Sequence, residues 1–97
     1  MAEIRWTEEA AAWLEDIYNY IAQDNPEAAS SVVNGIYDKT QSLKEFPQIG
    51  YIYRSEPEGN IRILLYGHYR ITYLVKAKEN IEILGVFHGS LDIDRYL

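Results

Sequence analysis

The first half of the chain places its apolar residues at helical spacing. A short alternating stretch, Glu3–Trp6, predicts a first strand. Thr7 then suits a helix N-cap, and Glu8 and Glu9 follow in the first turn, where the helix dipole favours anions. Apolar residues recur every three or four positions from there, namely Ala10, Leu14, Ile17 or Tyr18, and Ile21. This period predicts a helix of about four to five turns.

A second helical stripe follows directly. Asn25 suits an N-cap and Pro26 the first helical position, and the apolar period continues to Leu43. The helix is expected to end near Phe46-Pro47. Gly35 lies inside the stripe, which predicts a close approach to the other helix. Two helices joined by so few residues predict an antiparallel helical hairpin.

The second half of the chain changes to the spacing of strands. Four strands are predicted, at 51–54, 61–66, 69–76 and 81–87, with a tight turn at Gly67-His68 and another at 77–80. The last strand is apolar on both faces, which is typical of a strand in mid-sheet. The order is β-α-α-β-β-β-β. It predicts an α+β fold in which a helical hairpin packs on one face of a small, mainly antiparallel sheet, as a single domain over residues 1–97.

Composition and charge narrow the class of protein. The hydrophobic content of 47% is typical of a globular domain, and the absence of cysteine excludes disulfides and thiolate chemistry. Without a signal-peptide pattern or an apolar run of about 20 residues, a soluble cytoplasmic protein with no membrane contact is expected. Residues 1–45 carry the whole net charge of −6, whereas 54–78 hold five bases and two acids. An acidic surface disfavours direct binding of nucleic acid.

Candidate chemistry is sparse. Two histidines without a metal-binding spacing, and no glycine-rich phosphate loop, predict neither metal nor cofactor. Arg62, Arg70 and His88 remain as candidate catalytic residues, because arginine contacts phosphate and histidine transfers protons, which would suit metal-independent cleavage of RNA. Whether they share a face depends on two hairpin registers that the sequence leaves open. In the alternative interpretation both arginines pair with nearby acids and His88 is a strand-end residue.

Aromatic residues are the candidates for partner contacts. Nine tyrosines against two phenylalanines is an unusual ratio, and tyrosine suits both half-buried faces and interfaces. The residues expected to contact a partner are Trp13, Tyr66, Tyr69, Tyr73 and Phe87. The alternative is that these rings pack the rim of a small sheet.

Six short motifs occur in an order that resembles the RelE/ParE toxin superfamily, most closely its ParE-like branch, often labelled plasmid stabilisation proteins. They span about residues 3–92: Trp6-Thr7, Ile17 with Tyr20-Ile21-Ala22, Asn25-Pro26, Phe46-Pro47-Gln48-Ile49-Gly50, Tyr69-Arg70-Ile71-Thr72-Tyr73, and Ile83-Leu84-Gly85-Val86-Phe87-His88-Gly89. The resemblance implies the toxin of a bacterial type II toxin–antitoxin pair, neutralised by a cognate antitoxin. It further implies either a ParE-like toxin that binds a protein target such as DNA gyrase, or a RelE-like mRNA endoribonuclease.

Departures from the family pattern favour the ParE-like function. RelE-type nucleases resemble this chain in the strand arginine Arg70 and in a histidine near His88, but they are strongly basic. Here Tyr51 replaces the arginine typical after the Phe-Pro-x-x-Gly turn. Gly85 replaces the arginine often found before the Val-x-His motif of the last strand. Without those cations, docking on a ribosome is disfavoured. A non-enzymatic toxin is therefore expected, and a degenerate homologue that only binds antitoxin is a further alternative.

Overall fold

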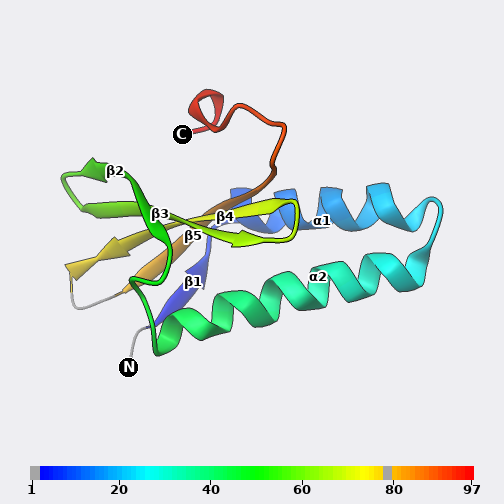
Figure 1. Ribbon diagram of the computed structural model, residues 1–97, viewed down its shortest axis with the longest axis horizontal. Coiled ribbons are helices and arrows are strands. Elements are labelled where there is room, and N and C mark those ends of the chain that lie inside the picture. Colours follow the sequence, from blue (N-terminus) through cyan, green and yellow to red (C-terminus); the bar gives the residue numbers. More distant parts are fainter. Residues whose placement is uncertain (1–2, 78–79) are drawn as a thin grey trace.

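The computed structural model describes residues 3–77 and 80–97, and Figure 1 shows two helices beside a five-stranded sheet. The helices are α1 (Glu8–Ala22) and α2 (Pro26–Gln41), the latter followed by a 3-10 turn (Ser42–Lys44). The strands are β1 (Ile4–Trp6), β2 (Tyr51–Glu56), β3 (Gly59–Tyr66), β4 (Tyr69–Lys76) and β5 (Ile81–His88). The sheet order is β1-β5-β4-β3-β2, with β1 parallel to β5 and the other pairs antiparallel. The predicted α+β fold is confirmed.

Both helices begin at the residues that the sequence indicates. The side-chain oxygen of Thr7 accepts a hydrogen bond from the backbone N–H of Ala10 at 3.1 Å, and Asn25 caps α2 in the same way at 3.0 Å. Each cap satisfies one of the backbone donors that a helix start leaves free. The expected end of α2 near Phe46 is corrected: regular helix stops at Gln41, because the chain tightens into the 3-10 turn before the loop at 46–50.

Three strands run longer than predicted, and one of them, β3, begins at Gly59. β2 continues to Glu56, since residues 54–56 pair with 59–61 of β3, and β5 includes His88, which pairs with Tyr69. Gly67 has a φ of 56°, which a two-residue hairpin turn favours, so the turn predicted at Gly67-His68 is confirmed. The turn predicted at 77–80 lies partly outside the described residues.

An irregular register in β5 decides which side chains face the helices. Thr72 pairs with Gly85 but the next residue, Tyr73, pairs with Ile83, so Leu84 is an extra residue in β5. This β-bulge places both Ile83 and Val86 in the core cluster beneath the helices. Phe87, which faces the other way, is buried in a second cluster, so β5 is apolar on both faces.

The sheet has two differently covered faces. The helix face packs against α1 and α2 through a cluster that includes Ile36, Leu43 and Ile71, all fully buried. The opposite face, here called the C-terminal face, packs against the segment Gly89–Leu97, whose Ile93 is buried. In Figure 1 this segment is red and lies across the strands from α2.

Gly35 allows a side chain of the sheet, and not the other helix, to approach α2. A Cβ built at Gly35 would lie 1.9 Å from the hydroxyl oxygen of Tyr66. The expectation of a close helix–helix approach is therefore wrong at this position. The missing side chain instead makes room for the Tyr66 ring.

Candidate partner-binding groove

A groove opens beside β5 where the short first strand ends. β1 pairs only with residues 81–83 of β5, so the second half of β5 has no strand on its outer side. α1 runs along this side. Five of its residues, spaced as one helical stripe, face the groove. The lining consists of Trp13, Asp16, Ile17, Tyr20 and Ile21 of α1 with Tyr69, Val86 and His88 of the sheet.

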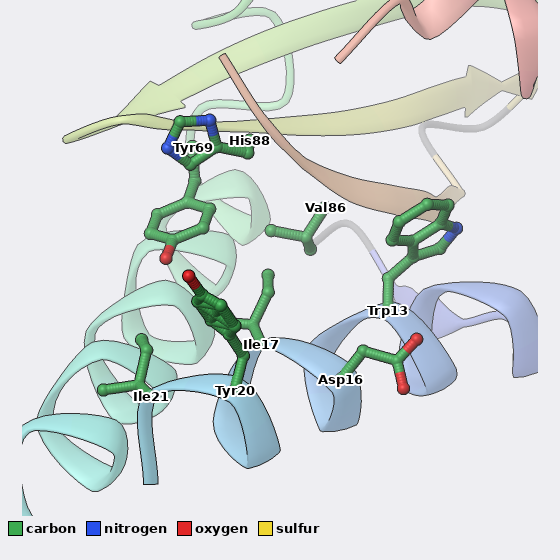
Figure 2. Close-up of a pocket in the computed structure, with 8 residues that line it drawn as sticks. All are labelled: Trp13, Asp16, Ile17, Tyr20, Ile21, Tyr69, Val86 and His88. Carbon is green, nitrogen blue, oxygen red and sulfur yellow. The ribbon is translucent and has the colours of Figure 1, made fainter. Parts of the chain in front are cut away.

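The groove has an apolar floor and a polar rim. Its volume is about 440 Å³. Figure 2 shows the rings of Tyr20 and Tyr69 pointing toward each other from opposite walls, with the His88 ring beside Tyr69. Tyr20 is 72% exposed, so its ring is available to an incoming molecule. We call this feature the α1–β5 groove.

His88 ends β5 in a small group of aromatic rings. Its ring lies edge-on to Tyr69, with centroids 5.7 Å apart, and stacks on His68 at 6.2 Å. The backbone N–H of Ser90 donates to Nδ1 of His88 at 3.2 Å. The Ser90 hydroxyl oxygen also lies 2.9 Å from Nδ1, so both Ser90 contacts hold the His88 ring at the end of β5.

The charge beside the groove is strongly negative. Residues 8–41, which form the helical hairpin, contain seven acids and a single base, Lys39. The rest of the chain is balanced, so the whole net charge of −6 belongs to the helices. Asp16 brings one of these carboxylates to the rim of the groove. The groove therefore suits an apolar partner segment that also carries a cation.

Arg62 fixes the loop between α2 and β2. Its guanidinium donates to the backbone oxygens of Gln48 at 3.0 Å and Gly50 at 2.6 Å. Tyr73 supports the same loop, donating to the oxygen of Pro47 at 3.0 Å and accepting from the N–H of Gly50 at 2.9 Å. Burial of the Tyr73 hydroxyl raises its pKa, and Arg62 opposes that shift only weakly. This arrangement stabilises a loop and leaves little of Arg62 for a substrate.

Arg70 lies on the C-terminal face. It pairs across the sheet with Leu65 and Phe87, and its guanidinium donates to the backbone oxygens of Leu91 at 2.5 Å and Gly89 at 3.3 Å. Arg62 and Arg70 thus bind backbone carbonyls. Within residues 3–77 and 80–97 neither arginine forms an ion pair with an acid, as the alternative interpretation had expected.

The three candidate catalytic residues do not converge. Directly opposed residues share a face, so His88 lies with Tyr69 and Arg62 with Tyr73, whereas Arg70 faces the other way. Tyr69 and Tyr73 are four residues apart, about 13 Å along a strand. No two of the three side chains form a joint site, so the geometry offers no phosphate clamp beside a proton donor.

The five candidate partner contacts divide into three groups. Trp13 and Tyr69 line the groove, although Trp13 also packs edge-on against Phe87 at 4.8 Å. Tyr66 is half-buried under α2. Tyr73 and Phe87 are 0% and 1% exposed, so the expectation that they contact a partner is corrected: the helices cover the first and the C-terminal segment covers the second.

Sequence reasoning missed Asp16 and Tyr20 as site residues. Tyr20 entered only as part of a family motif, and Asp16 was not singled out at all. The available signal was their spacing with Trp13, Ile17 and Ile21, which forms a second stripe beside the one that enters the core.

The remaining ionic network lies at the far end of β5. Glu82 pairs with Arg5 and with Lys76, whose Nζ is 3.1 Å away, and these hydrogen bonds lower the pKa of Glu82.

Within residues 3–77 and 80–97 no cluster of three or more potential metal ligands occurs. No helix in those ranges is long and apolar enough to cross a membrane.

Comparison with known proteins points to one family. The sequence model described as "ParE toxin of type II toxin-antitoxin system, parDE" matches residues 4–93. The protein named "Putative toxin Y4kP" from Sinorhizobium fredii (strain NBRC 101917 / NGR234) is 35% identical over 86 residues, which cover 89% of this chain and 86% of the relative.

Two solved structures share the fold. The chromosomal ParDE toxin–antitoxin system of P. aeruginosa contains a chain with 30% identity and a TM-score of 0.73, covering 91% of this chain and 96% of that one. The RelBE2 toxin–antitoxin complex of Mycobacterium tuberculosis matches at 24% identity and a TM-score of 0.59, with 89% and 95% covered. The second likeness concerns the fold alone.

Proposed function

Because the chain belongs to the ParE toxin family of type II toxin–antitoxin systems, we propose that it acts by binding a protein target and that a cognate antitoxin neutralises it. The observation that carries this proposal is the family match across residues 4–93. It is supported by a site that offers a groove and no convergent catalytic group.

The α1–β5 groove is the antitoxin site in this proposal. An amphipathic helix that lies in an apolar groove is a common mode of peptide recognition. Tyr20 and Tyr69 provide large rings on the two walls, and Asp16 provides an acceptor for a basic residue. The antitoxin segment is therefore expected to present apolar side chains to the floor and a lysine or arginine to Asp16.

DNA gyrase is the proposed target to test first. The proposal needs no chemistry from the toxin itself, which agrees with Arg62 and Arg70 being engaged with backbone carbonyls. Strong induction in a bacterial host is expected to arrest growth. Supercoiling by purified gyrase and the integrity of mRNA, measured in parallel, then identify the mode of action. Normal growth with verified soluble protein would contradict the proposal.

Two single substitutions test the groove. Tyr20→Asp removes an exposed ring and adds a charge, whereas Asn19→Asp adds the same charge at the adjacent exposed residue, which does not line the groove. Loss of an aromatic anchor should raise the antitoxin Kd about tenfold or more. Asn19→Asp should change it less than about twofold. Equal Kd values for both variants and wild type would place the antitoxin elsewhere.

The RNase alternative makes a different prediction. Mapped mRNA cuts during growth arrest, together with toxicity that Arg70→Ala abolishes while antitoxin binding persists, would establish it. Intact mRNA during arrest would remove it. Antitoxin binding without any growth arrest would identify a degenerate homologue.

A further inference from the structure

Trp13 belongs to two parts of the molecule. It lines the α1–β5 groove, and it also packs against the cluster of Phe87 and Ile93 on the C-terminal face. Among the described residues it is the one groove residue that also joins this cluster. Because β1 stops opposite Ile83 and leaves the flank of β5 open, the ring can reach past the strand. A change on the C-terminal face can therefore act on the groove through Trp13.

Three aromatic rings contact one another at this point. Trp13 lies edge-on to Phe87, with centroids 4.8 Å apart and planes at 73°, and edge-on to Tyr96 at 5.0 Å and 85°. Phe87 and Tyr96 stack on each other at 5.4 Å, with planes 20° apart. Edge-to-face and stacked pairs are the arrangements that aromatic rings prefer. The orientation of the Trp13 ring is thus set by one ring of the sheet and one ring of the C-terminal segment.

The two supporting rings differ in what else they do. Phe87 is 1% exposed and belongs to the core, so removing it disturbs the whole C-terminal face. Tyr96 is 48% exposed, so the fold depends on it far less. Removing the Tyr96 ring should mainly free one side of Trp13. Tyr96 therefore offers a way to change the groove without changing the core.

The C-terminal segment also holds a second lining residue. Ser90 contacts Nδ1 of His88 with both its backbone N–H and its hydroxyl oxygen. Among the described residues, none of 89–97 lines the groove itself. The segment therefore acts on the groove through side chains that it supports from behind.

Trp13 and the tyrosine pair form opposite ends of the groove. Trp13 and Tyr20 are seven residues apart on α1, which is two helical turns or about 10 Å. Figure 2 shows Trp13 at one end, Val86 in between, and Tyr20 with Tyr69 at the other end. A bound amphipathic helix presents apolar side chains at the same seven-residue spacing. One such side chain can pack against the tyrosines and the next against Trp13.

We infer that Tyr96 is a positioning residue for the α1–β5 groove: it holds the Trp13 ring in the orientation in which that ring receives an apolar side chain of the antitoxin. The inference rests on the proposed function, since it takes the antitoxin segment to lie in the groove. It requires that antitoxin affinity depend on a residue outside the groove, and that this dependence pass through Trp13.

Affinity for the purified cognate antitoxin, measured on full-chain variants, tests the inference. Tyr96→Ala removes the ring, Tyr96→Phe keeps it, and Tyr37→Ala is the matched control. Tyr37 is 49% exposed and stacks on Trp6, which does not line the groove. Tyr96→Ala should raise the Kd about fivefold or more. Tyr96→Phe and Tyr37→Ala should each leave it within about twofold of wild type.

A double-variant measurement separates an effect through Trp13 from a general loss of structure. In a Trp13→Leu background the ring that Tyr96 supports is gone. Adding Tyr96→Ala should then change the Kd by less than about twofold, because the two residues act as one unit. The same fivefold loss in both backgrounds would overturn the inference.

The fluorescence of Trp13 gives a readout that needs no partner. In a Trp6→Phe background Trp13 is the sole tryptophan. Tyr96→Ala should move its emission to longer wavelength, because the ring loses an apolar neighbour and gains water. Tyr96→Phe should leave the emission unchanged. Identical spectra for Tyr96→Ala and its parent would contradict the positioning role.

The outcomes separate this inference from the proposed function. A wild-type chain that binds antitoxin, together with a Tyr96→Ala Kd within twofold of it, would overturn the inference and leave the proposed function standing. Equal losses in Tyr96→Ala and Tyr37→Ala would do the same. A wild-type chain that binds no cognate antitoxin would overturn both.

Discussion

The two faces of the sheet are closed by different physical means. On the helix face, two amphipathic helices cover a cluster of fully buried aliphatic residues such as Ile36 and Ile71. On the C-terminal face, nine residues without regular helix or strand, apart from a 3-10 turn at Ile93–Arg95, cover Ile63 and Phe87. The helices are held on the sheet by a large buried apolar area. The C-terminal segment is held by a few specific contacts.

On the C-terminal face, arginines of the sheet hold backbone oxygens of the covering segment. Arg70 donates to Leu91 and Gly89, and Arg54 donates to Leu97 at 2.9 Å. Tyr96 stacks on Phe87 at 5.4 Å. The segment satisfies only some of its own carbonyl groups, such as those of Asp92 and Ile93, and side chains of the sheet satisfy others. Stability on this face should therefore depend on single residues, whereas the helix face distributes it over many.

The largest expected effect is at Phe87. Phe87→Ala should lower the free energy of unfolding by about 3–5 kcal/mol, because it leaves a cavity between Trp13 and Tyr96. Leu65→Ala changes a residue that is 57% exposed and is the matched control, with an effect within about 0.5 kcal/mol. Urea unfolding measures both. Similar losses for the two variants would refute the view that this face depends on one central ring.

Tyr73 gives the next largest effect, on the helix face. Tyr73→Phe removes two hydrogen bonds to the loop at 46–50 and leaves the Pro47 oxygen and the Gly50 N–H without these partners, so a loss of about 2 kcal/mol is expected. Burial raises the pKa of Tyr73. At alkaline pH the Tyr73 hydroxyl therefore stays protonated in the native state, whereas in the unfolded chain it loses its proton. The free energy of unfolding should fall as pH rises above about 10. Tyr73→Phe should weaken that alkaline loss, and an unchanged slope would contradict the assignment.

Arg70→Ala should detach the C-terminal segment at an expected loss of about 1.5 kcal/mol, the lower end of the range for a hydrogen bond from a charged group. Arg70→Lys should restore part of it. Limited proteolysis is the sensitive measurement: cleavage near Gly89 should accelerate in Arg70→Ala, while cleavage within the helices should not. Protection equal to wild type would show that the apolar contacts of Ile93 suffice.

The smallest effect is expected at the rim of β5. Glu82→Gln breaks the ion pairs with Arg5 and Lys76 and should lower stability by at most about 1 kcal/mol at pH 7. The pKa of Glu82 is lowered by these partners, so its contribution is present above the ordinary carboxyl pKa and is lost as pH falls through the folded value. Wild type and variant should therefore converge in acid. A constant difference down to pH 3 would argue against an ionic origin.

Much of the fold follows from local patterns. Thr7 and Asn25 start the helices because their side chains cap free N–H groups. Gly67 turns the hairpin because it accepts a positive φ.

The candidate site was less predictable than the fold. Sequence reasoning found Trp13, Tyr69 and His88 but not that Asp16 and Tyr20 join them, because the groove exists only where β1 leaves β5 uncovered.

The sequence by itself determined the order of the elements, their approximate ends and the family, because period, capping residues and motifs act over a few neighbouring positions. Only the tertiary structure decided which residues meet. One extra residue in β5, Leu84, sets the face on which Phe87 and His88 lie. Contacts such as Arg70 with Leu91 join positions far apart in the chain. Local propensity carries no information about such pairs.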